Sequence, residues 1–203
     1  MTDHGERSTI GVPSRRLLLA FLLVAVTIVT VSLALGLRKD ERPPRVEAGV
    51  PAPALATTAA RGGKVSLDRL RGHVVLLSFL NSRAEATREG DPSRAQIVFL
   101  RSMEKQHERF GLRVIVVDAA ELAGAGKPSR NDLVNYTYDW NLDPAIAVLA
   151  DDGTFARRFA VEAAPTSFMI GRGGVVRERW DGFVPAAQLD LAIRRLEGRG
   201  PTG

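Results

Sequence analysis

Two groups of side chains in this sequence have types and spacings that could do chemistry, and the first group is acidic. Asp118, Glu121, Asp151 and Asp152 could bind a cation if the fold brought their carboxylates together. The last two run into Gly153, and this pattern is typical of a turn, because aspartate side chains there accept hydrogen bonds from nearby amides. We therefore expect a turn at this run and predict no metal site.

The second group consists of the three histidines, His4, His73 and His107. A metal site needs ligands at paired spacings, whereas these three lie on different segments. Their spacing indicates no Ser-His-Asp arrangement either. We expect His73 to lie at the surface where a strand begins, and His107 to be a solvated residue on a helix.

The composition excludes one broad class of chemistry. The 203 residues include no cysteine, so the chain forms no disulfide, no thiolate nucleophile, no CxxC redox pair and no cysteine zinc site. The net charge is +5, but the basic residues are scattered rather than interleaved with aromatic ones. We therefore predict no nucleic-acid partner, and the sequence indicates no cofactor.

An uncharged apolar segment, Leu17–Leu37, lies near the N-terminus. As a helix it would span about 31 Å, close to the ~30 Å hydrocarbon core of a bilayer. The alternatives are a cleaved secretory signal, whose apolar run is usually ~7–15 residues, and a weak twin-arginine signal at residues 14–17. Basic residues on both sides leave its orientation open. We predict a polar tail at 1–16, a membrane helix at 17–37, a linker at 38–50, a folded domain at 51–197 and a tail at 198–203.

Two apolar runs flank a helical pattern at the start of the domain. Residues 73–80 and 112–118 are typical of strands buried on both faces. After a polar loop at 81–90, Asp91 and Pro92 start a helix, because the aspartate caps free amides and proline there loses no needed donor. Strand, helix and strand in this order predict parallel pairing. Gly111 ends the helix, and we expect its core-facing stripe to be Ala95, Phe99, Met103, Gln106 and Phe110.

The remaining elements complete an α/β domain. We predict a helix at 131–138 with Asn131 or Asp132 near its cap, a short strand at 145–149, a short helix at 154–159, a hairpin of strands at 165–170 and 175–180, and an amphipathic helix at 185–196. This order indicates a mixed central sheet flanked by helices, with a C-terminal hairpin and helix.

Four segments in this order and spacing resemble a known family. The segments are 49–53, 65–79, 159–170 and 171–176. They resemble, in turn, the entry segment, first core strand, cis-proline region and following hairpin of membrane-anchored thioredoxin-like (redoxin) proteins, the extracytoplasmic thiol–disulfide reductases of the TlpA/ResA type. The resemblance implies a thioredoxin-like fold with one N-terminal transmembrane helix.

The chain departs from this family at its catalytic motif. The family carries a CxxC at the start of the helix after the first core strand, where free amides and the helix dipole stabilise a thiolate. Counting back from Val114 places the motif at residues 91–94, and counting forward from Phe79 places it at 84–87. Neither segment contains sulfur, so the resemblance transfers no catalytic residue.

The resemblance also implies a cis peptide bond between Ala164 and Pro165. In this family the residue before that proline offers backbone groups to an extended partner chain. A candidate binding groove therefore comprises Ala164, Pro165, Thr166, Asp91 and Arg94. The alternatives are that Asp91 is only a helix cap and that Pro165 forms a retained turn without a present function.

Three functions are consistent with these observations. The first is a single-pass membrane protein whose extracytoplasmic thioredoxin-like domain is a non-catalytic module that binds an extended peptide or an envelope protein. The second is a redoxin-type oxidoreductase component that acts with a cysteine-bearing partner or an unseen cofactor. The third is a structural tether in envelope biogenesis, which only the apolar segment supports.

Overall fold

The computed structural model describes residues 45–83 and 91–198. The chain divides into two units between residues 41 and 42, and every described residue belongs to the second. The predicted membrane helix at 17–37 and the predicted tail at 1–16 lie outside the described residues. Within residues 45–83 and 91–198, no helix is both long and apolar enough to cross a bilayer.

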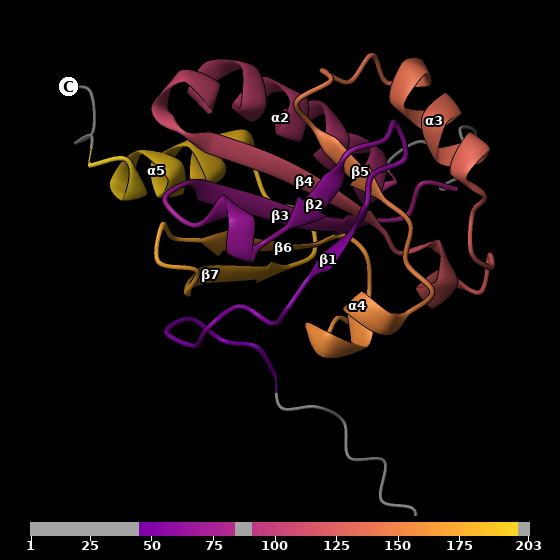
Figure 1. Cartoon of the computed structure of the whole chain (residues 1–203), viewed down its shortest axis with the longest axis horizontal. Helices are drawn as coiled ribbons and strands as arrows, with labels where there is room; N and C mark the ends of the chain where they lie inside the picture. Colours follow the sequence, from indigo (N-terminus) through magenta and orange to yellow (C-terminus); the bar gives the residue numbers. More distant parts are fainter. Residues whose placement is uncertain (1–44, 84–90, 199–203) are drawn as a thin grey trace, which may run out of the picture. The chain divides into compact units, whose positions relative to one another are not determined.

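A mixed five-stranded sheet, in the order β5-β4-β3-β6-β7, forms the centre of the domain (Figure 1). Strands β3, β4 and β5 are parallel, and β6 and β7 are antiparallel to their neighbours, so the predicted sheet type and hairpin are confirmed. The structure adds a small separate hairpin, β1 with β2, which the sequence did not indicate. The strands are β1 (Ala56–Thr58), β2 (Lys64–Ser66), β3 (Val74–Leu80), β4 (Leu112–Asp118), β5 (Ala147–Leu149), β6 (Thr166–Ile170) and β7 (Val176–Asp181).

Helices flank the sheet as the sequence predicts. They are α2 (Pro92–His107), α3 (Arg130–Asp139), α4 (Thr154–Arg158) and α5 (Ala186–Leu196), with 3-10 turns η1 (Asp68–Leu70), η2 (Glu108–Phe110) and η3 (Ala120–Ala123). Asp132 lies near the cap of α3, as predicted. Ser129 is the N-cap, and its side chain and that of Asp132 form a capping box with each other's amides.

Helix α2 begins and ends where the sequence predicts, but it buries a different face. Gly111 stops it after η2 with a φ of 91°, a left-handed conformation that favours glycine. Of the five residues of the predicted stripe only Met103 is buried; Ala95 and Gln106 are exposed, and Phe99 and Phe110 are half-buried. The buried face instead comprises Ser93, Gln96, Ile97, Leu100, Met103, Glu104 and His107. Because this buried face includes polar residues, a pattern of apolar residues at helical spacing does not identify it.

His107 shows why the prediction for that face is wrong. It was expected to be solvated, but only 1% of it is exposed. Its Nε2 lies 2.8 Å from the Asp190 carboxylate on α5, and its Nδ1 lies 3.2 Å from both carboxylate oxygens of Glu197. Each ring nitrogen therefore lies beside a carboxylate, and this buried polar contact ties the end of α2 to α5 and the residue after it.

The two faces of the sheet have separate cores. Alternate residues of β3 and β4 contact α2, α3 and α5 on one face. On the other face, Phe79, Phe159 and Phe168 form a cluster with ring centroids 5.3–6.0 Å apart, packed against α4. Residues near the start of the described chain cover this second core, and Val46 is 7% exposed there.

The acidic residues singled out from the sequence form turns and caps. The Asp151 carboxylate accepts hydrogen bonds from the amides of Phe155 and Ala156 at 2.9 and 2.8 Å, and it thereby caps α4. Asp152 accepts from the Thr154 amide. No group of acidic or histidine side chains among residues 45–83 and 91–198 is arranged to hold a metal ion.

Candidate functional site

The first turn of α2 occupies the position that the resemblance assigns to a catalytic motif. The Asp91 side chain accepts a hydrogen bond of 2.8 Å from the Ser93 amide, which confirms the expected helix cap. Ser93 is 2% exposed, and its hydroxyl accepts a hydrogen bond of 3.2 Å from the amide of Asn81, just after β3. The helix N-terminus is therefore satisfied by a carboxylate within the chain. The alternative motif position, residues 84–87, lies outside the described residues.

The second part of the site is the loop before β6, where the Ala164–Pro165 peptide bond is cis. Thr166 pairs with Phe79 across β6 and β3, so this loop and the N-terminus of α2 both lie at the edge where β3 ends. The Pro165 carbonyl accepts a hydrogen bond of 2.8 Å from Gly182. Within the described part of the chain, neither the amide nor the carbonyl of the half-buried Ala164 takes part in a hydrogen bond.

The structure divides the predicted groove residues between two cavities. Arg94 lines a cavity between α2 and α3, described below. Thr166 lines a different cavity of about 360 Å³ with Arg45, Arg179 and Asp181, and its hydroxyl donates a hydrogen bond of 2.7 Å to the Ala163 carbonyl. The five predicted residues therefore lie at one edge of the sheet but do not line one pocket.

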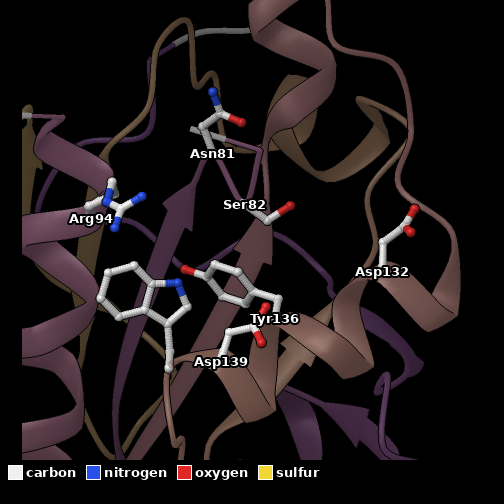
Figure 2. Close-up of a pocket in the computed structure, with 7 residues that line it drawn as sticks. Asn81, Ser82, Arg94, Asp132, Tyr136 and Asp139 are labelled. Atoms are coloured by element: carbon white, nitrogen blue, oxygen red, sulfur yellow. The ribbon is translucent and has the colours of Figure 1, made fainter. Parts of the chain in front are cut away.

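The cavity that includes Arg94 has a volume of about 420 Å³ (Figure 2). Its lining comes from the end of β3, the first turn of α2 and one face of α3: Asn81, Ser82, Arg94, Asp132, Tyr136, Asp139 and Trp140. The guanidinium carbon of Arg94 lies 5.1 Å from the centre of the Trp140 ring. This distance is within the range of a cation–π interaction, so the cation lies on an aromatic surface.

A buried acid behind the cavity lining and a phenol within the lining affect the electrostatics of this cavity. Asp118, at the end of β4, is 1% exposed and accepts a hydrogen bond of 2.9 Å from the Ser82 amide. Burial raises the pKa of Asp118, although hydrogen bonds from Ser82 and Ala120 oppose that shift. Burial also raises the pKa of Tyr136, with the nearby Asp118 charge adding to the effect, so its hydroxyl stays protonated.

The α3 side of this cavity was not predicted from the sequence. Asp132, Tyr136 and Trp140 recur every four residues and therefore share one face of α3. That spacing was available in the sequence, but the neighbouring Leu133 and Val134 make the segment resemble any helix with an apolar face. Only the packing of α3 against the end of β3 shows that this face meets Arg94.

Comparisons with known proteins place the chain near one class of enzyme. No family model matches it. It is 25% identical over 176 residues to the thiol–disulfide oxidoreductase ResA of Bacillus cereus strain ZK / E33L, a match that covers 86% of this chain and 92% of that protein. It is 22% identical over 181 residues to ResA of Bacillus thuringiensis subsp. konkukian, covering 89% of this chain and 96% of that protein.

Solved structures agree with the sequence comparison. A Chlorobium tepidum protein described as a thiol:disulfide interchange protein of the DsbE type has a TM-score of 0.62 and 26% identity, covering 75% of this chain and 99% of that one. StoA of Bacillus subtilis has a TM-score of 0.54 and 16% identity, covering 70% of this chain and 96% of that one. The chain thus has a thioredoxin-like α/β fold and homologues among thiol–disulfide oxidoreductases.

Proposed function

We propose that this protein is a membrane-anchored, extracytoplasmic thioredoxin-like module that binds a partner and has no dithiol activity of its own. One observation carries the proposal: a chain similar to thiol–disulfide oxidoreductases over most of its length contains no cysteine. Disulfide exchange proceeds through a mixed disulfide and requires a thiolate. The groups at the start of α2, the Asp91 carboxylate and the Ser93 hydroxyl, cannot form one.

The partner that fits the remaining site is an extended peptide from an envelope protein. The amide and carbonyl of Ala164 have no hydrogen bonds within the described residues, so they can pair with an added strand. An apolar surface lies beside them. The Gly182 amide donates a hydrogen bond to the Pro165 carbonyl, and the next residue, Phe183, is therefore close to this loop. Phe183 is 42% exposed, and its ring centroid lies 5.5 Å from that of Phe99.

The membrane anchor in this proposal is Leu17–Leu37. Its support is the sequence alone, namely an uncharged segment long enough to cross the hydrocarbon core. By analogy with the redoxin family, the short tail at 1–16 would be cytoplasmic and the domain would lie outside the cell membrane. Protease protection of the domain in intact cells, followed by its loss after permeabilisation, would test this topology.

Site-specific crosslinking tests the binding surface. A photo-crosslinking residue at Phe183 of the full-length protein should give a discrete adduct in native membranes, and the same residue at Tyr138, which is 70% exposed on α3, should not. Substituting Ala163, which is exposed beside the cis-proline loop, with a bulky tryptophan should weaken the Phe183 adduct. Equal adducts from both positions, or none from Phe183, would contradict the proposal.

A second candidate is an accessory oxidoreductase component that acts with a cysteine-bearing partner. Its support is the similarity to ResA across 86% of the chain. Insulin reduction by the purified protein distinguishes the two functions. We expect no turnover above buffer with the protein alone, and the accessory function predicts that it changes the rate of an added thiol–disulfide reductase.

A further inference from the structure

The cavity between α2 and α3 contains a cation that no acid in the described part of the chain neutralises. Arg94 is half-buried and contacts the Trp140 ring, yet it has no ion pair or hydrogen bond from its side chain to residues 45–83 or 91–198. Arg83, by contrast, lies 3.2 Å from the Asp132 carboxylate. A half-buried guanidinium without a partner is a ready acceptor site for a carboxylate.

A second unpartnered group is directed into the same cavity. Tyr136 is only 9% exposed, and its hydroxyl makes no hydrogen bond to any described residue. In Figure 2 this hydroxyl points toward the side of the cavity from which Arg94 enters. A phenol that stays protonated can donate, so Arg94 and Tyr136 together present two donors to one acceptor.

The acidic residues of the cavity restrict which ligand fits. Asp132 is already used by Arg83 and by the Ser129 amide, whereas Asp139 has no partner among the described residues. These two carboxylates in the lining disfavour a dianion such as phosphate. They favour a ligand that adds a positive group on the α3 side, where Figure 2 shows Asp139.

We propose that this cavity binds a free α-amino acid as its zwitterion. The ligand's carboxylate accepts hydrogen bonds from Arg94 and Tyr136, its ammonium group lies at Asp139, and its side chain contacts the Trp140 ring. The cavity volume of about 420 Å³ is within the usual range for small-molecule sites. The site is separate from the proposed peptide surface, because neither Ala164 nor Phe183 lines it.

Tryptophan fluorescence of the full-length protein in detergent tests this site. The chain has two tryptophans, so a Trp180→Phe background leaves Trp140 as the only reporter. We expect saturable changes with glycine and L-leucine, with binding at least about tenfold weaker for acetate and no change with methylammonium or inorganic phosphate. Acetate has only the carboxylate and methylammonium only the ammonium group, so each makes only part of the proposed contacts.

Variants assign the signal to named groups. Arg94→Gln and Tyr136→Phe should each weaken glycine binding, the first by about tenfold or more and the second by less, because a charged donor contributes more than a neutral one. The matched control is Arg109→Gln, since Arg109 also stacks on an aromatic ring, 4.6 Å from the centre of Phe110, but lies at the other end of α2.

Three results would overturn the proposal: no saturable change with either amino acid, acetate or phosphate binding as tightly as glycine, or an equal loss in Arg94→Gln and Arg109→Gln. The titration of the Trp180→Phe protein already decides the first two, so the proposal remains testable even if the Arg94 or Tyr136 variant unfolds. Failure here would leave the crosslinking result at Phe183 unaffected, so the two proposals can be separated.

Discussion

Replacing His107 with glutamine should destabilise the domain far more than its place in a polar, helical stretch of sequence suggests. The imidazole is 1% exposed and contacts Asp190 through one nitrogen and Glu197 through the other. The Glu197 side chain is itself 1% exposed. Glutamine cannot reach both acidic groups from the two sides of a ring, so the substitution leaves at least one buried acidic group without its partner.

The structure sets the size of this loss. Removing one partner of a buried ion pair costs roughly 3–5 kcal/mol. The lower end applies here, because the Asp190 side chain is 29% exposed and still bonds to Arg194 at 2.7 Å, and Glu197 has a further interaction of its own. We expect about 3 kcal/mol, or a fall in Tm of roughly 6–12 °C for a domain of this size.

Urea unfolding of the full-length protein, followed by circular dichroism at pH 6.5, measures the effect. The control is the same substitution at His73, which is half-buried and has an Nδ1 without a hydrogen-bond partner in the described residues. That variant should lose less than about 1 kcal/mol. If His107→Gln loses no more than His73→Gln, the contact between α2 and α5 does not stabilise the fold and our account of it is wrong.

Substitutions at three further sites test other parts of the structure by the same unfolding measurement. Burial, with the nearby Asp143 charge adding to it, raises the pKa of Glu104, so the folded state binds the extra proton and the contribution of Glu104 to the free energy of unfolding falls as pH rises above about 4.5. Glu104→Gln should remove that fall and stabilise the domain by about 1 kcal/mol at pH 7 but not at pH 3.5; a variant less stable at pH 7 would contradict this. Asp91→Ala should cost about 1 kcal/mol through loss of the α2 cap, and Asp91→Asn should cost much less. Ser78→Ala should cost about 1–2 kcal/mol because it strands the buried Ser167 hydroxyl 2.6 Å away, and adding Ser167→Ala should recover part of the loss rather than add to it.

The sheet was predictable because its strands depend on local composition. Residues 74–80 and 112–118 are mostly apolar, and all seven residues of β3 are buried. Asp91, Pro92 and Gly111 fixed the start and end of α2 because their backbone chemistry acts within one turn. The β1 and β2 strands were missed because three residues each are too few to show a period.

The buried polar contacts and the cavity were not predictable in this way. His107 is buried because Asp190 and Glu197 reach it from about 80 to 90 residues further along the chain. The cavity likewise depends on α3 meeting α2 at the end of β3, which places Trp140 against Arg94. Sequence spacing identifies the face of a helix, but it does not show which distant side chain the fold will bring to that face.

The aspartate at the start of α2 also affects what an introduced cysteine could do in this protein. A cysteine introduced at Ser93 would find its own amide already bonded to a carboxylate 2.8 Å away. That negative charge would raise the thiol pKa, where a helix start normally lowers it. A single Ser93→Cys substitution would therefore give a mostly protonated and weakly nucleophilic thiol. An active exchange site would require replacement of Asp91 as well. Thiol–disulfide exchange at this helix start therefore depends on more than the presence of a cysteine, because the cap at Asp91 opposes thiolate formation.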